Sequence, residues 1–478
     1  MRIPIPTPAA AVAAAVVGAA VTAGADMGLL APAAAALGTA AAFGVVLVST
    51  APTTDDADTR VHRLLVTPIA LVLSVVAALL VGGIVDWWLI EPVAYVLGAA
   101  VGAAAAFWLY RRLATTLALS FGAVVAAGVL ALAVTSLVLW LSGVAPFHAF
   151  GRMLEFGLQP DSLVIMVNSG TTFYLSAVAV AIGFKMKLFN IGVDGQYRLA
   201  ALMAAAVGGA WVLPPVVHQV VVISVAVAVG GVWAGIAGYL KVARGVSEVI
   251  STIMLNSVAT GITAYLLNTD RLAVQISTNN IGTPEIAESG WVPGIPAGFM
   301  GADREIFGLV VLAIAVGVGY WTMLNRTRFG FDLRATGQSP TAARASGIDI
   351  KRMVLLSMVI SGMVAGLVGM PQLLGQSHYY ALDFPTGLGF TGIAIALLGR
   401  NHPVGIGFAA LFWAFLDQSS QILDFEGIPK EIAVVTQATI VLTVVVVYEV
   451  VHRWGLRYQQ QQVGRELARG DREGAAAS

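Results

Sequence analysis

A short polar stretch at residues 189–196 interrupts a chain that is otherwise strongly apolar. It reads Phe-Asn-Ile-Gly-Val-Asp-Gly-Gln and lies between two apolar runs. It contains one carboxylate, Asp194, and two amides, Asn190 and Gln196. A carboxylate at the centre of a membrane helix costs roughly 2.5–3.5 kcal/mol on insertion scales, so it usually faces protein, a cavity or a solute. We therefore interpret the stretch as part of a polar path through a membrane-embedded bundle.

Two other interpretations of this stretch stay open. Its glycines suit an unwound or re-entrant backbone, which needs hydrogen-bond partners at membrane depth. Asn190 and Gln196 could supply those partners and never touch a solute. Lys185 and Lys187 just upstream also allow a polar loop at the membrane surface.

Three further side chains complete the predicted path. Asn256 lies in a later apolar segment, and Phe189 could stack on a flat solute. Arg198 follows Asp194 by four residues, a spacing at which the two side chains can pair on a helix. Pairing would lower the cost of holding both charges inside the bundle. If Arg198 instead faces the path, we expect an anionic or more polar solute.

The composition places the chain in a membrane. Of its 478 residues, 58% are hydrophobic and only 11% are charged, whereas soluble domains carry about 25% charged residues. The 26 basic and 26 acidic residues balance, which excludes a strongly basic surface for nucleic acid. The chain has no cysteine, so a disulfide, a thiolate zinc site and a cysteine nucleophile are excluded. We expect an all-α integral membrane protein, a polytopic helical bundle.

Apolar runs of about 17–25 residues predict where the chain crosses the membrane. We place spans at 8–25, 28–48, 64–85, 92–110, 116–141, 163–184, 199–213, 218–240, 249–267, 306–324, 353–374, 404–422 and 432–451. A shorter segment at 387–398 is either a span or a re-entrant segment. Arginine and lysine collect in alternate loops between these spans. By the positive-inside rule, both termini are cytoplasmic in a multi-pass cell-membrane protein. The long external loop 268–305 could cap a pore mouth, meet an external partner or serve as a solvated linker.

The cytoplasmic loop 325–352 contains a compact helix signal. Ser339 is a good N-cap, Pro340 suits the first helical position and Gly347 suits the C-terminal cap. Residues 341–346 between them give about two turns of small side chains, and a helix this short is marginal alone. We expect it to lie parallel to the membrane and dock into a cytoplasmic protein. Packing on the chain's own spans is the alternative.

Four motifs, in order over about residues 163–451, resemble one family. The loop 333–348, Leu-Arg-Ala-Thr-Gly-Gln-Ser-Pro-Thr-Ala-Ala-Arg-Ala-Ser-Gly-Ile, resembles the coupling loop of bacterial ABC importer permeases. The stretch 189–196 is similar to the Asn-Ile-Gly-(Ala/Val)-(Glu/Asp)-Gly-Gln signature of the permease group for branched-chain amino acids, simple sugars and nucleosides. Segments 247–256 and 389–403 resemble its nucleoside branch. The chain departs from the family at Thr341, where an acid is common, and at Arg198, where an apolar residue is usual.

The resemblance implies a permease subunit that moves a nucleoside or a related sugar-containing solute inward, with a simple sugar or a branched-chain amino acid as the alternative. It implies about ten core spans or re-entrant segments at 116–452, preceded by about four additional spans at 1–115 and followed by a cytoplasmic tail at 453–478. It also implies a second permease subunit, similar or identical, an external solute-binding protein and surrounding membrane lipid.

The energy source would be a separate cytoplasmic ABC ATPase that holds ATP and Mg, because the chain has no GxxxxGK(S/T) loop and needs no cofactor of its own. The residues implied in ATPase coupling are Ser339, Pro340, Thr341, Ala342, Ala343, Arg344, Gly347 and Ile348.

Two other function classes would require different residues. An ion-coupled secondary carrier would use Asp194 as a proton or cation site. An intramembrane enzyme would need a catalytic constellation, but the six histidines are scattered and neither HExxH nor GxSxG occurs. We therefore assign no catalytic residue and no metal ligand.

Overall fold

The computed structural model describes residues 146–425 continuously, together with 134–136, 139, 434–435, 438–439 and 442. The chain divides into two compact units, one of residues 143–437 and one of residues 1–142 and 438–478. The predicted spans at 8–25, 28–48, 64–85 and 92–110 and the tail at 453–478 lie outside the described residues, as do nearly all of 116–141 and 432–451.

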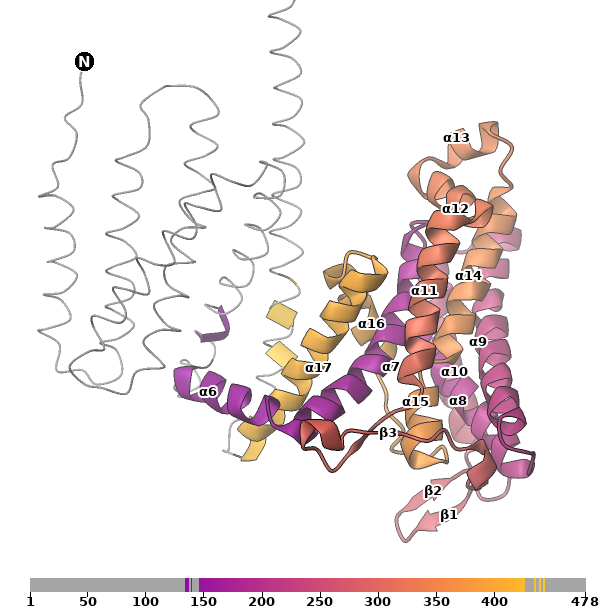
Figure 1. The fold of residues 1–478 in the computed structure, drawn as a ribbon. Coiled ribbons are helices and arrows are strands. Elements are labelled where there is room, and N and C mark those ends of the chain that lie inside the picture. Colours follow the sequence, from indigo (N-terminus) through magenta and orange to yellow (C-terminus); the bar gives the residue numbers. More distant parts are fainter. Residues whose placement is uncertain are drawn as a thin grey trace, which may run out of the picture. The chain divides into compact units, whose positions relative to one another are not determined.

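Residues 146–425 fold into a helical bundle with short strands at one end and a pair of short helices at the other (Figure 1). Eleven of its α-helices are α6 (Pro146–Gly157), α7 (Pro160–Phe184), α8 (Val193–Ala210), α9 (Val217–Arg244), α10 (Glu248–Leu266), α11 (Val310–Arg326), α12 (Arg328–Gln338), α13 (Pro340–Ala345), α14 (Ile350–Gly366), α16 (Leu388–Leu398) and α17 (Pro403–Phe425). The turn α15 (Met370–Gln372) and the π-helical turn η4 (Leu373–Ser377) extend α14.

Four helical segments of residues 146–425 are long and apolar enough to cross a membrane: α7, α9, α10 and Ile350–Ser377. The helices α11 and α12 provide a fifth if their pair, bent by 73°, is one span. These segments agree with the predicted spans 163–184, 218–240, 249–267, 306–324 and 353–374 to within a few residues at most ends. The short predicted segment 387–398 is the apolar helix α16, with 11 residues.

Helices α9 and α14 pack with their backbones in direct contact. A Cβ atom added at Gly362 would lie 3.0 Å from the carbonyl carbon of Gly230, and one at Gly366 would lie 2.7 Å from that of Ala226. Small residues permit this approach, which is how helices gain dispersion contacts when lipid offers no hydrophobic driving force. A larger side chain on either face would separate the two helices.

Helix α7 lies at the centre of the unit and is 61% buried over its most apolar window. It packs against α14, α16 and α17. The Ser176 hydroxyl donates a hydrogen bond to the carbonyl oxygen of Leu388, 2.7 Å away, and the Ser361 hydroxyl donates to that of Ala179, at 2.6 Å. Helix α7 is therefore one of the two most enclosed membrane-spanning segments among the described residues, together with Ile350–Ser377.

The loop at 268–305, predicted to be external and called the external loop below, is folded. It forms β1 (Val274–Ser277), β2 (Asn280–Gly282), β3 (Ile295–Pro296) and β4 (Glu305–Ile306), with 3₁₀ turns η2 (Glu288–Gly290) and η3 (Gly298–Met300) between them. The strands β1 and β2 pair antiparallel, as do β3 and β4.

Backbone hydrogen bonds fix this loop to the bundle. Thr283 donates to the carbonyl oxygen of Tyr380 and Val292 donates to that of Leu374. Trp291 also stacks on His378, with ring centroids 3.9 Å apart. The loop is therefore a fixed part of this end of the bundle rather than a solvated linker.

Candidate functional site

The stretch 189–196 joins α7 to α8 and includes the first turn of α8; we call it the turn at 189–196. The amides of Asn190 and Gln196 pair reciprocally, at 3.0 and 2.8 Å. Asn190 also donates to the Ser361 hydroxyl at 2.8 Å and accepts from the Gly192 backbone N–H at 3.1 Å. Both amides are 1% exposed. Each buried polar atom is thus satisfied inside the chain, which fits the interpretation of these amides as caps.

Asn256 of α10 holds the same turn from a second side. Its side-chain oxygen accepts from the Gly195 backbone N–H at 2.9 Å, and its nitrogen donates to the Ile191 carbonyl oxygen at 2.9 Å. The sequence places Asn256 more than sixty residues away, so this contact depends on how α8 and α10 pack. Four predicted path residues are brought together here: Asn190, Asp194, Gln196 and Asn256.

Asp194 and Arg198 face each other across one turn of α8, with Oδ2 and a guanidinium nitrogen 4.0 Å apart. The same nitrogen of Arg198 donates to the Thr260 hydroxyl at 3.1 Å. The Asp194 and Arg198 side chains are 11% and 19% exposed, respectively. The spacing of four residues therefore produces the predicted pairing geometry, at the outer limit of an ion-pair contact.

Phe189 lies apart from this cluster. Its side chain is 47% exposed, and its ring meets that of Phe184 edge-on with centroids 5.1 Å apart. Its proposed stacking on a solute stays a prediction.

The first turn of α8 also supports the segment that precedes α16. The Tyr197 hydroxyl donates to the Pro385 carbonyl oxygen at 2.8 Å. A Cβ atom at Gly389 would lie 2.9 Å from the Cα atom of Asp194, so only glycine fits between the two backbones. The stretch recognised from sequence thus fixes the position of residues 385–389.

A cavity of about 570 Å³ lies next to that segment, at the same end of the bundle as the external loop. This volume is in the range of small-molecule sites, about 300–1,000 Å³. Four separate regions line it: 165–173 of α7, 294–307 of the external loop, 368–388 around η4, and 417–421 of α17. None of the six predicted path residues lines it; the closest link is through Tyr197 to Pro385.

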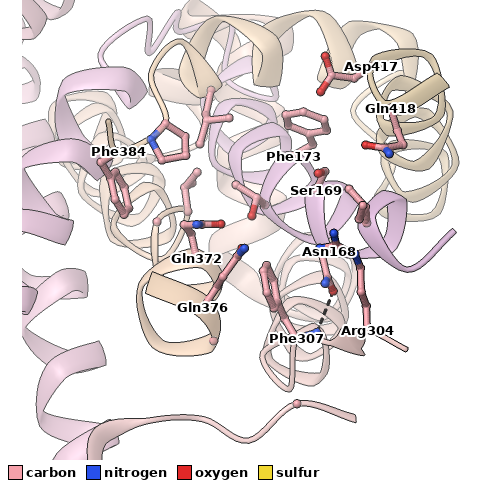
Figure 2. Close-up of a pocket in the computed structure, with 18 of the residues that line it drawn as sticks. Asn168, Ser169, Phe173, Arg304, Phe307, Gln372, Gln376, Phe384, Asp417 and Gln418 are labelled. Carbon is pink, nitrogen blue, oxygen red and sulfur yellow. Dashed lines mark hydrogen bonds between the residues drawn. The ribbon is translucent and has the colours of Figure 1, made fainter. Parts of the chain in front are cut away.

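The cavity combines phenylalanine rings with amides (Figure 2). Its rings are Phe173, Phe307 and Phe384, its amides are Asn168, Gln372, Gln376, Gln418 and Gln421, and its charged side chains are Arg304, Glu305 and Asp417. Such a lining can bind a neutral, flat, hydroxyl-bearing molecule, with apolar contact from the rings and hydrogen bonds from amides and carboxylates.

The prediction from sequence missed these residues, although a signal was present. Asn168, Gln372, Asp417 and Gln418 all stand inside predicted apolar spans, where polar side chains usually face a cavity or a partner. Sequence alone does not show that they converge.

The opposite end of the bundle carries α12 and α13 (Figure 1). The Ser339 hydroxyl accepts from the Ala342 backbone N–H at 3.3 Å, and Pro340 is the first helical residue, so the predicted start of α13 is confirmed. At its end, Ile348 donates to the Ala343 carbonyl oxygen and Gly347 donates to that of Arg344, both at 3.0 Å. Gly347 has φ +81°, so this is a Schellman cap.

Thr341, Ala342 and Arg344 are exposed on α13, whereas Ala343 is 3% exposed. One side of the helix therefore packs on the chain and the other is free for a partner. The preceding helix α12 was not predicted, because residues 328–338 lack an apolar run and looked like loop.

Lys185 connects this end to the turn at 189–196. A Cβ atom at Gly337 of α12 would lie 3.0 Å from the Cα atom of Met186, so α12 rests on the segment that follows α7. Burial lowers the pKa of the Lys185 ammonium, and the nearby Arg334 guanidinium lowers that pKa further. Lys185, which directly follows α7, is thus close enough to Arg334 of α12 to feel its positive charge.

Comparison with known proteins gives consistent matches over this unit. A family described as branched-chain amino acid transport system / permease component matches residues 162–448. The guanosine ABC transporter permease protein NupP of Bacillus subtilis is 33% identical over 326 residues, which cover 67% of this chain and 92% of NupP. The glucose ABC transporter permease protein TsgB13 of Haloferax volcanii is 33% identical over 330 residues, covering 65% and 83%. The nucleoside ABC transporter permease protein NupB of Lactococcus lactis is 30% identical over 325 residues, covering 62% and 86%. No solved structure matches the chain.

Proposed function

This chain belongs to the family of branched-chain amino acid transport system permease components, and we propose that it is the membrane permease subunit of an ABC importer for a nucleoside or related sugar-containing solute. The observation that carries the proposal is the similarity to guanosine and nucleoside permeases over most of their length. It is a multi-pass membrane protein and a transport component rather than an enzyme. The similarity to a glucose permease supports a simple sugar as the second candidate solute.

The two ends of the bundle would have different roles in import. A solute-binding protein delivers solute at the end formed by the external loop, where the cavity lies. A separate ATPase, which holds the ATP and Mg, docks on the exposed face of α13. Both termini would be cytoplasmic, with α13 on the same side.

Transport requires two bundle states with different affinities for the solute, and ATP binding shifts the balance between them. Helix α7 is suited to link the two ends. Its first half lines the cavity, and the turn that follows its last residue rests against α12.

A second permease subunit, similar or identical, would complete the transporter. Helix α10 supports this part of the proposal, because it is only 22% buried over its most apolar window. Its exposed residues include Ser257, Thr260 and Gly261, beside larger apolar residues such as Met254 and Val258. Small and hydroxyl-bearing residues on a membrane helix favour helix–helix packing over contact with lipid.

The test of function is uptake of labelled guanosine into cells with and without the chain and its partner subunits. We expect uptake to require the chain, to stop on ATP depletion and to survive collapse of the proton gradient. Uptake that stops with the proton gradient would favour an ion-coupled carrier instead. Uptake of glucose with no nucleoside uptake would keep the permease class and change the solute.

Coupling is tested at an exposed position of α13. The change Ala342→Glu places a bulky acid on the free face, so we expect loss of ATPase co-purification and of transport with normal amounts of permease. Ala343 is unsuitable because it is buried, and an acid there would disturb the chain's own packing. The matched control is Thr278→Glu, an exposed position in the external hairpin, which should retain the ATPase. Normal ATPase binding by Ala342→Glu would contradict docking at α13.

A further inference from the structure

Two glutamines of the cavity stand on an irregular turn. Gln372 ends α15, and Gln376 lies in the π-helical turn η4. Such turns are rare and occur frequently at functional sites. Both amides line the cavity, and Figure 2 shows them between Phe384 on one side and Phe307 on the other. Gln376 is exposed to the cavity and Gln372 is partly exposed, so both can contact a ligand.

Two glycines let the phenylalanine rings lie against this turn. A Cβ atom at Gly369 would be 3.2 Å from the Phe384 ring, and one at Gly375 would be 3.1 Å from the Phe307 ring. Phe384 also stacks on Tyr380, with centroids 4.5 Å apart. The two rings and the amide-bearing turn between them therefore form one wall of the cavity, which we call the slot.

The slot is also fixed on the side of the external loop. The Phe307 backbone N–H donates to the Asn168 side chain at 2.8 Å, and the Asn168 amide donates to the Glu305 carbonyl oxygen at 3.0 Å. This two-point contact joins α7 to the segment that carries Phe307. Asn168 therefore holds the segment with Phe307 against α7 at the cavity wall.

The chemistry of the slot matches the edge of a nucleobase. A glutamine amide offers an acceptor oxygen and two donor hydrogens, and amides pair with the donor and acceptor arrays on base edges. Proteins that recognise single bases combine such edge contacts with aromatic side chains. Asp417 and Gln418 of α17 lie on another wall of the same cavity (Figure 2) and can accept hydrogen bonds from sugar hydroxyls.

We infer that this cavity is a nucleoside-binding site within a single permease subunit, in which Gln372 and Gln376 read the edge of the base and Phe384 and Phe307 bound it. The inference rests on the proposed function, because it takes the solute to be a nucleoside. It adds a specificity-determining site at the outer end of the permease itself, beyond any selection by a solute-binding protein.

The experiment compares the assembled transporter with its Gln372→Ala and Gln376→Ala variants in proteoliposomes. The matched control is Gln275→Ala, an exposed amide on β1 outside the cavity. We measure KM for guanosine, for inosine, which lacks the exocyclic 2-amino group, and for 7-deazaguanosine, which lacks the N7 acceptor. ATPase activity without solute reports whether each variant is folded and assembled.

We expect the KM for guanosine to rise roughly tenfold in each cavity variant and to stay unchanged in Gln275→Ala. For at least one analogue, the ratio of its KM to the KM for guanosine should fall towards one in a cavity variant. The variant lacks the amide that bonded to the group missing from that analogue. Wild-type KM values and unchanged analogue ratios in both variants would overturn the inference and leave the proposed function intact. A wild-type transporter that carries no nucleoside would overturn both.

Discussion

The turn at 189–196 and the cavity beside η4 are both rich in amides, but they use those amides in different ways. In the turn, Asn190 and Gln196 are 1% exposed and bond to each other, and Asn256 bonds to the surrounding backbone. In the cavity, Gln372 and Gln376 face open space. A polar residue in an apolar segment therefore indicates a constraint, and only its partners show whether that constraint is structural or functional.

The two regions also have complementary roles. The turn closes on itself and then fixes residues 385–389 through Asp194 and Tyr197. Pro385 and Leu388 of that segment, and the adjoining Phe384, line the cavity. Contact of Asn190 and Gln196 with solute stays a prediction. Their hydrogen bonds favour a structural role, in which they hold the turn that positions residues 385–389.

The largest expected effect separates the two regions directly. The change Asn190→Ala leaves the Gln196 amide, the Ser361 hydroxyl and the Gly192 N–H without their shared partner. Unsatisfied buried groups cost about 1–3 kcal/mol each, and the Ser361 hydroxyl keeps its bond to Ala179, so the other two groups should lower stability by roughly 2–6 kcal/mol. Thermal unfolding of the purified permease measures this fall.

The control for that change is Asn325→Ala, because Asn325 is an exposed amide near the end of α11. It should unfold like the wild type. If Asn190→Ala kept wild-type stability and instead raised the KM for solute, the turn would be a solute site and the contrast with the cavity would fail.

An intermediate effect is expected at Asp194. The change Asp194→Asn removes the negative charge that lies 4.0 Å from Arg198 but keeps an oxygen near the Gly389 N–H, at 3.5 Å. We expect a loss of about 1–2 kcal/mol in stability, less than for a tight buried pair because the contact is long. The double variant with Arg198→Gln should lose less than the sum of the single variants.

Uptake by Asp194→Asn sharpens the same comparison. Transport per folded molecule should be retained if Asp194 only positions the 385–389 segment. Complete loss of uptake at normal stability would instead indicate a proton or cation site at Asp194, as an ion-coupled carrier requires.

The smallest effect is expected at Lys185, which directly follows α7 and lies near α12. Its pKa is lowered in the folded state by burial and by Arg334, so the unfolded chain binds more protons between that lowered pKa and the ordinary lysine pKa of 10.5. Stability should therefore rise slightly with pH over that alkaline window. The change Lys185→Gln should remove this rise, measured as unfolding temperature against pH. If the unfolding temperature of that variant still rose with pH over the alkaline window, groups other than Lys185 would cause the rise.

Much of the bundle could be predicted from local patterns. Apolar runs located α7, α9, α10, α11 and α14 because each helix must match the thickness of the membrane. Ser339, Pro340 and Gly347 located α13 because caps act on neighbouring backbone groups. The i, i+4 spacing predicted the Asp194–Arg198 contact for the same local reason.

The cavity was decided by tertiary structure. Its lining comes from four regions separated by as many as 256 residues, from 165 to 421, and no local pattern records that Gln372 and Gln418 share a space. The stretch 189–196 shows the converse: the sequence marked it as polar and buried, but Ser361 of α14 binds the Asn190 amide and Asn256 of α10 binds the backbone of Gly195. The sequence determined which polar groups must be shielded from lipid, because the desolvation cost of a polar group depends on its own chemistry. Whether each group meets another side chain or an open cavity depends on packing between distant helices, which only the folded structure settles.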